Sequence, residues 1–280
     1  MMPVDRSAVV ANSRSVLRRV ADAYAQAIAA QTPLPVPRAE LAREMPRLVA
    51  VSKTFPAECV AACYETGQRH FGENYLHELQ EKAPALAGCL DIRWHYIGRI
   101  QSNKIRKICE TPGLWCVETL ESQKHADALQ KACADLQIPQ LNVFIQVNTS
   151  AESNKGGVEL GVVAVSRQVS SDADESIGTE ELECLAQHIL HNCPNLKFLG
   201  LMTIGSLTES RLSAGERNRD FCALIAARRR ICAALNIANV QDVELSMGMS
   251  NDFEAAIRHG ATNVRVGSSI FGARNYAAKN

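Results

Sequence analysis

The chain has 280 residues, 46% hydrophobic and 5% aromatic, with 30 basic and 30 acidic side chains, so its formal net charge is zero. It can bury one sizeable core, and its neutrality and scarce aromatic residues exclude the surface typical of nucleic-acid-binding proteins. No run of 18 apolar residues predicts a membrane-spanning helix, and ten cysteines without a CxxC pair indicate free thiols in a reducing compartment.

The first 46 residues are expected to form an N-terminal helix and a connector. Residues 6–30 are rich in alanine, with apolar positions at helical spacing, and a proline-rich stretch follows up to residue 37. The arginines of this helix could also suit a transit peptide, but we interpret it as a helix that packs on the domain. We therefore expect a cytoplasmic protein, with a mitochondrial location as the alternative.

Apolar runs and helical stretches then alternate along the chain. Strands are predicted at residues 48–51, 70–71, 93–97, 114–118, 141–147, 197–202, 243–246 and 263–266. Helices are predicted at residues 56–67, 74–86, 100–109, 121–136, 179–191, 214–235 and 251–259. Eight such units predict a single α/β domain over residues 1–280, folded as a (β/α)8 TIM-type barrel. An open doubly wound sheet is the alternative, and the polar segment 159–178 is interpreted as a surface insertion.

Lys53 is the second residue after the first predicted strand, at the end where reactive groups of a parallel barrel lie. Partial desolvation at a strand end lowers the pKa of a lysine and frees its amine to form a Schiff base. Asn74 lies just after the second predicted strand and His95 lies near the end of the third, and both could bind a planar ligand. A helix N-cap for Asn74 and a buried structural role for His95 are the competing interpretations.

The loops after the last two predicted strands, residues 246–252 and 265–272, are rich in glycine and serine and lead into helices. Backbone N–H groups and hydroxyls at such positions bind anions, and phosphate sites of this fold often use these two loops. Arg265 lies on the same strand face as Gly267, so it is expected to face the ligand. If that ligand contains a pyridine ring, a guanidinium beside the ring nitrogen would keep this nitrogen unprotonated.

A metal site is not expected. Cys184, His188, His191 and Cys193 lie close together in the sequence, but their spacing differs from that of structural zinc sites.

Six motifs occur in an order that resembles the pyridoxal phosphate homeostasis protein family, also called the YggS/PROSC family. They are residues 48–54 (LVAVSKT), 71–75 (FGENY), 94–98 (WHYIG) with 101–104 (QSNK), 200–203 (GLMT), 245–250 (LSMGMS) and 264–268 (VRVGS). The resemblance runs from about Leu48 to Tyr276. Tyr96, where the family has phenylalanine, and the insertion depart from it.

The resemblance implies a barrel like the N-terminal domain of alanine racemase, with pyridoxal 5′-phosphate (PLP) as cofactor. It implies a Schiff base on Lys53, Arg265 near the pyridine nitrogen, and Asn74 and Met202 along the ring. It places the phosphate against Ser246, Met247, Gly267 and Ser268. The implied function is PLP homeostasis without substantial turnover, with release by transimination to PLP-dependent apo-enzymes as recipients.

Two other functions remain open. A PLP-dependent amino-acid racemase would need a second catalytic base, and after the eighth unit we expect no further domain to supply one. A class I aldolase would use Lys53 and the phosphate loops without PLP. No membrane partner is expected, and the chain is expected to be a monomer or a weak dimer.

Overall fold

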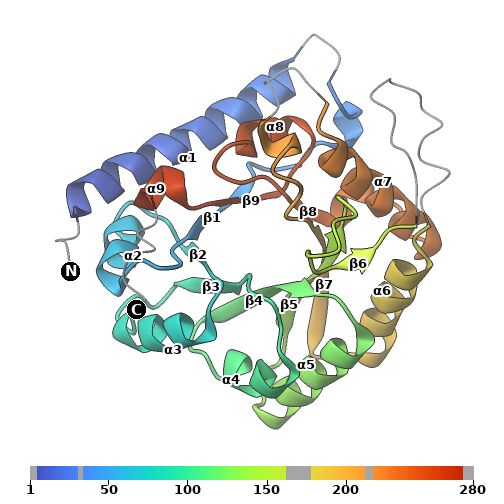
Figure 1. Cartoon of the computed structure of the whole chain (residues 1–280), viewed down its shortest axis with the longest axis horizontal. Coiled ribbons are helices and arrows are strands. Elements are labelled where there is room, and N and C mark those ends of the chain that lie inside the picture. The colour runs from blue at the N-terminus through green and yellow to red at the C-terminus, as the bar shows by residue number, and fades with distance from the viewer. Residues whose placement is uncertain (1–4, 31–33, 162–177, 212–216, 274–280) are drawn as a thin grey trace.

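The structure is a computed structural model that describes residues 5–30, 34–161, 178–211 and 217–273. Within these ranges, eight parallel strands surround a common axis, with helices outside them (Figure 1). The strands are β1 (Arg47–Val51), β2 (His70–Glu73), β3 (Arg93–Tyr96), β4 (Leu114–Leu120), β5 (Leu141–Asn148), β7 (Leu196–Met202), β8 (Glu244–Ser246) and β9 (Asn263–Val266). A two-residue strand, β6 (Val158–Glu159), pairs only with β5.

The strand pairing closes the sheet. Its order is β4-β3-β2-β1-β9-β8-β7-β5, and β4 also pairs with β5, at Cys116↔Asn142 and Val117↔Val143. The predicted (β/α)8 barrel is therefore confirmed, and the open doubly wound sheet is excluded.

The outer layer contains the predicted helices. They are α1 (Arg6–Ala29), α2 (Ala57–Tyr64), α3 (Leu76–Ala85), α4 (Ile105–Cys109), α5 (Gln123–Asp135), α6 (Glu180–Asn192), α7 (Arg219–Ala234) and α8 (Phe253–Arg258), with a short α9 (Ser268–Phe271) after β9. The side chain of Asp5 accepts a hydrogen bond from the backbone of Ala8, which satisfies one free N–H group at the start of α1. The buried face of α1 packs across α2, α8 and α9, as the barrel-packing interpretation predicted (Figure 1).

The core has two parts. The larger apolar cluster fills the space between the helices and the strands. A smaller cluster, formed by Cys116, Phe144, Leu199 and Met202, is separate from it. It shares its strand faces with several polar side chains, so the space that the strands enclose is largely polar.

In the described part of the chain, no helix is long and apolar enough to cross a membrane. Most of the predicted insertion, residues 162–177, lies outside the described residues, and an antiparallel bridge joins Gly161 to Gly178 on either side of it.

Candidate functional site

A cavity of about 120 Å³ lies at the carboxyl ends of the strands. Its lining residues come from the ends of β1, β2, β3, β7, β8 and β9, the end of a parallel barrel that carries reactive groups. They are Val51, Lys53, Asn74, Ile97, Met202, Ile204, Met249, Ser250, Arg265, Gly267 and Ser268. The cavity thus brings together six of the eight predicted site residues.

The segment that carries Lys53 is held by α3. The backbone N–H of Thr54, a residue with φ of 69°, donates to Glu78 Oε2 over 2.7 Å. Lys82 Nζ donates to the carbonyl oxygen of Ser52 over 2.9 Å and to Glu73 Oε1 over 2.7 Å. These bonds fix the backbone on both sides of Lys53, so the position of its side chain depends on α3.

Glu73 is a fully buried carboxyl group beside this segment. Its Oε1 accepts from Ser52 Oγ over 2.6 Å, in addition to the bond from Lys82. Burial raises the pKa of Glu73 to about 7, although the charge of Lys82 and both hydrogen bonds act in the opposite direction. Glu73 therefore takes up a proton more easily than an ordinary glutamate does.

Asn74 enters the cavity with an acceptor available for a ligand. Its Oδ1 is buried and has no hydrogen-bond partner within the described ranges. A buried acceptor without a donor is costly, and a ligand that brings a hydroxyl or N–H group would satisfy it. The site therefore fits a polar ligand on this wall.

Gly98 allows the chain to pass close to Asn74. A Cβ atom on residue 98 would lie 1.8 Å from the carbonyl oxygen of Asn74, so any larger residue would displace one of the two segments. This contact gives a physical reason for the glycine in the motif at residues 94–98.

Arg265 is held rigidly at the opposite wall. Its side chain is 4% exposed, and it donates to Ser246 Oγ over 2.5 Å and to the carbonyl oxygen of Thr203 over 2.6 Å. Burial lowers the pKa of Arg265, while the charge of Glu118 acts in the opposite direction. The guanidinium keeps further N–H groups for a ligand, because arginine has five donors.

Ser246 and Met247 lie behind the cavity and do not line it. Ser246 is fully buried and bonded to Arg265, and the N–H of Met247 donates to the carbonyl oxygen of Asn263. The chain then turns at Gly248, with φ of 91°, and brings Met249 and Ser250 into the wall.

The loops after β8 and β9 meet at this wall. The backbone N–H of Gly267 donates to Ser250 Oγ over 3.2 Å, and the hydroxyl of Ser269 donates to the carbonyl oxygen of Ser250 over 3.4 Å. The glycine- and serine-rich character of both loops had indicated this region. The lining residues of the loop after β8 are thus Met249 and Ser250, three residues beyond the predicted Ser246 and Met247, and the turn at Gly248 that places them there was not predicted from the sequence.

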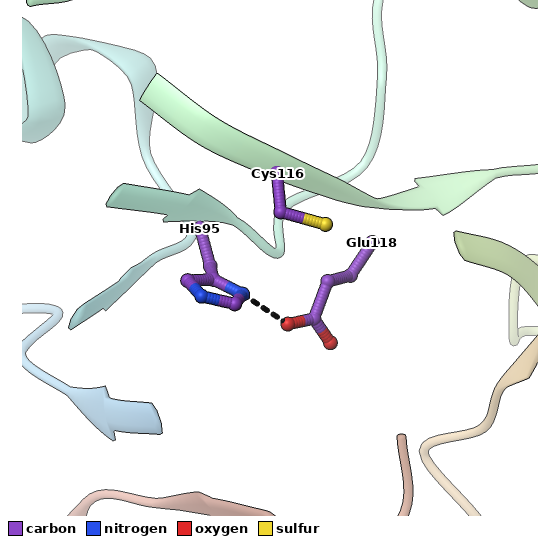
Figure 2. Close-up of side chains that lie close together, drawn as sticks. All are labelled: His95, Cys116 and Glu118. Atoms are coloured by element: carbon purple, nitrogen blue, oxygen red, sulfur yellow. Dashed lines mark hydrogen bonds and ion pairs between the residues drawn. The ribbon is translucent and has the colours of Figure 1, made fainter. Parts of the chain in front are cut away.

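His95 does not line the cavity. It lies inside the barrel with Cys116 and Glu118 (Figure 2), and its Nδ1 donates to Glu118 Oε1 over 2.5 Å. All three residues are fully buried, so the position of His95 agrees with the competing interpretation of a buried structural role.

The side chains of His95, Cys116 and Glu118 are close enough to one another to hold a metal ion, and a second group of possible metal ligands lies at α5 and the end of α6. It combines His188 and Cys193 with Asp127 rather than with Cys184, and His188 is already hydrogen-bonded to Asp127 over 2.6 Å.

Comparison with known proteins agrees with the barrel fold described above. Residues 38–173 match the family model of the alanine racemase N-terminal domain. A pyridoxal phosphate homeostasis protein from Caenorhabditis elegans is 51% identical over 236 residues, which cover 83% of this chain and 88% of the relative. The chain belongs to the pyridoxal phosphate homeostasis protein family. The human family member is 43% identical over 267 residues, which cover 94% of this chain and 87% of the human protein.

Solved structures agree with this family assignment. The structure of PipY from Synechococcus elongatus with PLP bound has a TM-score of 0.64 and 27% identity, and the match covers 91% of this chain and 99% of PipY. Alanine racemase from Corynebacterium glutamicum, at 14% identity and a TM-score of 0.61, shares the fold. That match covers 99% of this chain and 64% of the racemase. The chain is thus an alanine-racemase-type barrel of the homeostasis family.

Proposed function

We propose that this protein binds PLP and acts in intracellular PLP homeostasis. The observation that carries the proposal is a cavity at the carboxyl ends of the barrel, which brings Lys53, Arg265 and the loops after β8 and β9 together. The name shared by the relatives from nematode to human, and PLP bound to PipY, support the same cofactor. The ten cysteines are free thiols, which supports a reducing compartment such as the cytoplasm.

Each wall of the cavity has a part in this proposal. Lys53 holds the cofactor as a Schiff base, and Arg265 lies near the pyridine nitrogen. Gly267 and Ser268 bind the phosphate, together with Ser250 of the neighbouring loop. Asn74 and Met202 flank the ring, while Ser246 and Met247 support the phosphate loop from behind.

When bound, PLP supplies an aldehyde that forms an imine with an amine. We propose that the protein keeps this chemistry for storage and release, by transimination to an incoming amine, and has no substantial turnover. A single barrel domain over residues 1–280 carries the site at its strand ends. Turnover of amino acids clearly above that of free PLP would instead make the chain a racemase.

The decisive test is the absorbance spectrum of the purified protein with added PLP. The wild type should show the visible band of a lysine imine, and Lys53→Ala should lack it. Lys197→Ala, which removes an exposed lysine at the opposite end of the barrel, should leave the band unchanged. A wild type that stays colourless with PLP would contradict the proposal. An adduct that borohydride traps only with a sugar phosphate would favour an aldolase.

A further inference from the structure

Glu118 is a fully buried carboxylate on β4, in the interior of the barrel (Figure 2). It does not line the cavity. Its Oε1 accepts from His95 Nδ1 over 2.5 Å and from Asn263 Nδ2 over 3.0 Å, and its Oε2 accepts from Ser246 Oγ over 2.6 Å. Burying a carboxylate costs free energy unless hydrogen bonds compensate for it, so the three hydrogen bonds to Glu118 inside the barrel indicate a specific role.

The hydroxyl of Ser246 links Glu118 to the wall of the cavity. Ser246 Oγ accepts from Arg265 over 2.5 Å and from Asn263 over 2.9 Å. A hydroxyl has one hydrogen and two lone pairs, so both lone pairs are used and the hydrogen points to Glu118. The guanidinium of Arg265 also lies 3.8 Å from Glu118 Oε2, so the two charges attract each other directly as well.

The other side of Glu118 fixes the direction of the remaining hydrogen bonds. A carboxylate only accepts, so His95 carries its proton on Nδ1 and accepts on Nε2. His70 Nδ1, 2.8 Å from that Nε2, is therefore the donor, and His70 Nε2 faces Arg93 at 3.4 Å. Burial lowers the pKa of both histidines, which keeps them neutral.

The charge of Glu118 is consequently balanced by Arg265 and not by an imidazolium. We propose that Glu118 is a positioning residue of the cofactor site, which holds the Arg265 guanidinium in place through Ser246 and by direct attraction. This inference rests on the proposed function, since it assigns Glu118 a role toward the same PLP site. Glu118 touches no ligand itself and acts through the arginine.

Glu118→Gln tests the inference with little change in volume. The amide would present a donor to either His95 Nδ1–H or the Ser246 hydroxyl, and Arg265 would lose its counter-charge. We expect PLP to bind roughly tenfold more weakly, as for residues coupled in one network. Glu40→Gln is the matched control, because it breaks ion pairs with Arg228 and Arg229, which join α7 to the segment before β1. Its PLP affinity should stay near that of the wild type.

A second readout uses the protein without PLP. Nitrogen NMR of apo protein should show His95 with its proton on Nδ1 in the wild type, and Glu118→Gln should shift both this signal and the guanidinium signal of Arg265. A wild type without PLP affinity would refute the proposed function, while these signals would still test the contact. A folded Glu118→Gln protein with unchanged Arg265 signal and unchanged PLP affinity would overturn the inference.

Ser246→Ala keeps the charge of Glu118 and removes only the hydroxyl link, so it serves if Glu118→Gln does not fold. It should also shift the Arg265 signal and weaken PLP binding. If neither quantity changes in this variant, the link through Ser246 is wrong.

Discussion

At the scale of single residues, the site depends on a few close approaches that tolerate no extra atom. Gly98 lies against the backbone of Asn74, whose side chain enters the cavity. Asn74 carries a buried acceptor that is aimed at a ligand, so a shift of its backbone would misplace that acceptor. The glycine therefore supports the geometry of the cavity without touching a ligand.

Gly98→Ala is expected to destabilise the protein by about 1–3 kcal/mol, the usual cost of forcing a methyl group into a packed site. It should also weaken PLP binding, because Asn74 must move. Urea unfolding measures the first effect and PLP titration the second. Gly88→Ala is the control, since a Cβ at that exposed position would meet no atom within 4 Å. Equal stability of the two variants would show that the segment at residue 98 relaxes freely.

At the scale of elements, α3 supports two strand ends through one buried ammonium group. Lys82 is 6% exposed and joins Glu73 at the end of β2, Glu78 on its own helix, and the backbone of Ser52 after β1. Removing this cation would leave two carboxylates without their counter-charge, and it would take one hydrogen bond from each of them and from the carbonyl oxygen of Ser52. The segment that carries Lys53 would keep only the bond from the Thr54 N–H to Glu78 as its described hydrogen bond to the helix.

Lys82→Met should therefore lower the free energy of unfolding by about 3–5 kcal/mol, the cost of leaving a buried partner unpaired. Lys131→Met, at an exposed position of α5, should change it by less than about 0.5 kcal/mol. Chemical denaturation of both variants gives the comparison. In the double variant Lys82→Met with Glu73→Gln, part of the loss should return, because the uncompensated carboxylate is gone. No recovery would mean that Glu73 is already neutral in the single variant.

The elements themselves were largely predictable because strands of a parallel barrel are buried on both faces and appear as apolar runs. All eight barrel strands were predicted within three residues at either end, whereas β6 and α9, of two and four residues, carry too little pattern. Lys53 followed from the strand-end rule. Met249 and Ser250 were covered only as members of the loop 246–252, because the turn at Gly248 decides which residues of that loop reach the cavity. Glu118, an acidic residue at the end of an apolar run, was the available indication of the interior network.

At the scale of the whole molecule, buried titratable groups link folding to pH. Burial lowers the pKa of His70 to about 2 and of His259 to about 4, and it lowers that of His95 as well. The unfolded chain binds protons at these histidines below about pH 6.5, whereas the folded chain does not. Glu73 has the opposite effect, because its pKa of about 7 lets the folded chain hold a proton that the unfolded chain releases.

Three histidines outweigh one glutamate, so the free energy of unfolding should fall as the pH drops from about 7.5 to about 5.5, by of order 1–2 kcal/mol per pH unit in the lower half of that range. The pKa of Glu118 is lowered, so its contribution is lost only at more acidic pH. Urea midpoints across this range give the slope. His259→Asn should reduce this slope, because it removes one of the three histidines. His259 packs against Phe221 and does not line the cavity, so the variant leaves the cavity residues in place. A midpoint that stays constant or rises on acidification would show that the folded histidines do take up protons.

The bridge between Gly161 and Gly178 also bears on how this family can diverge. The two glycines are paired, so the described residues on either side of positions 162–177 meet at one point. The entropy of closing a loop grows only logarithmically with its length, by about 0.6 kcal/mol for each doubling. Evolution can therefore lengthen or shorten the stretch between these glycines at little cost to the barrel, and a reporter tag inserted there should leave the rest of the molecule undisturbed.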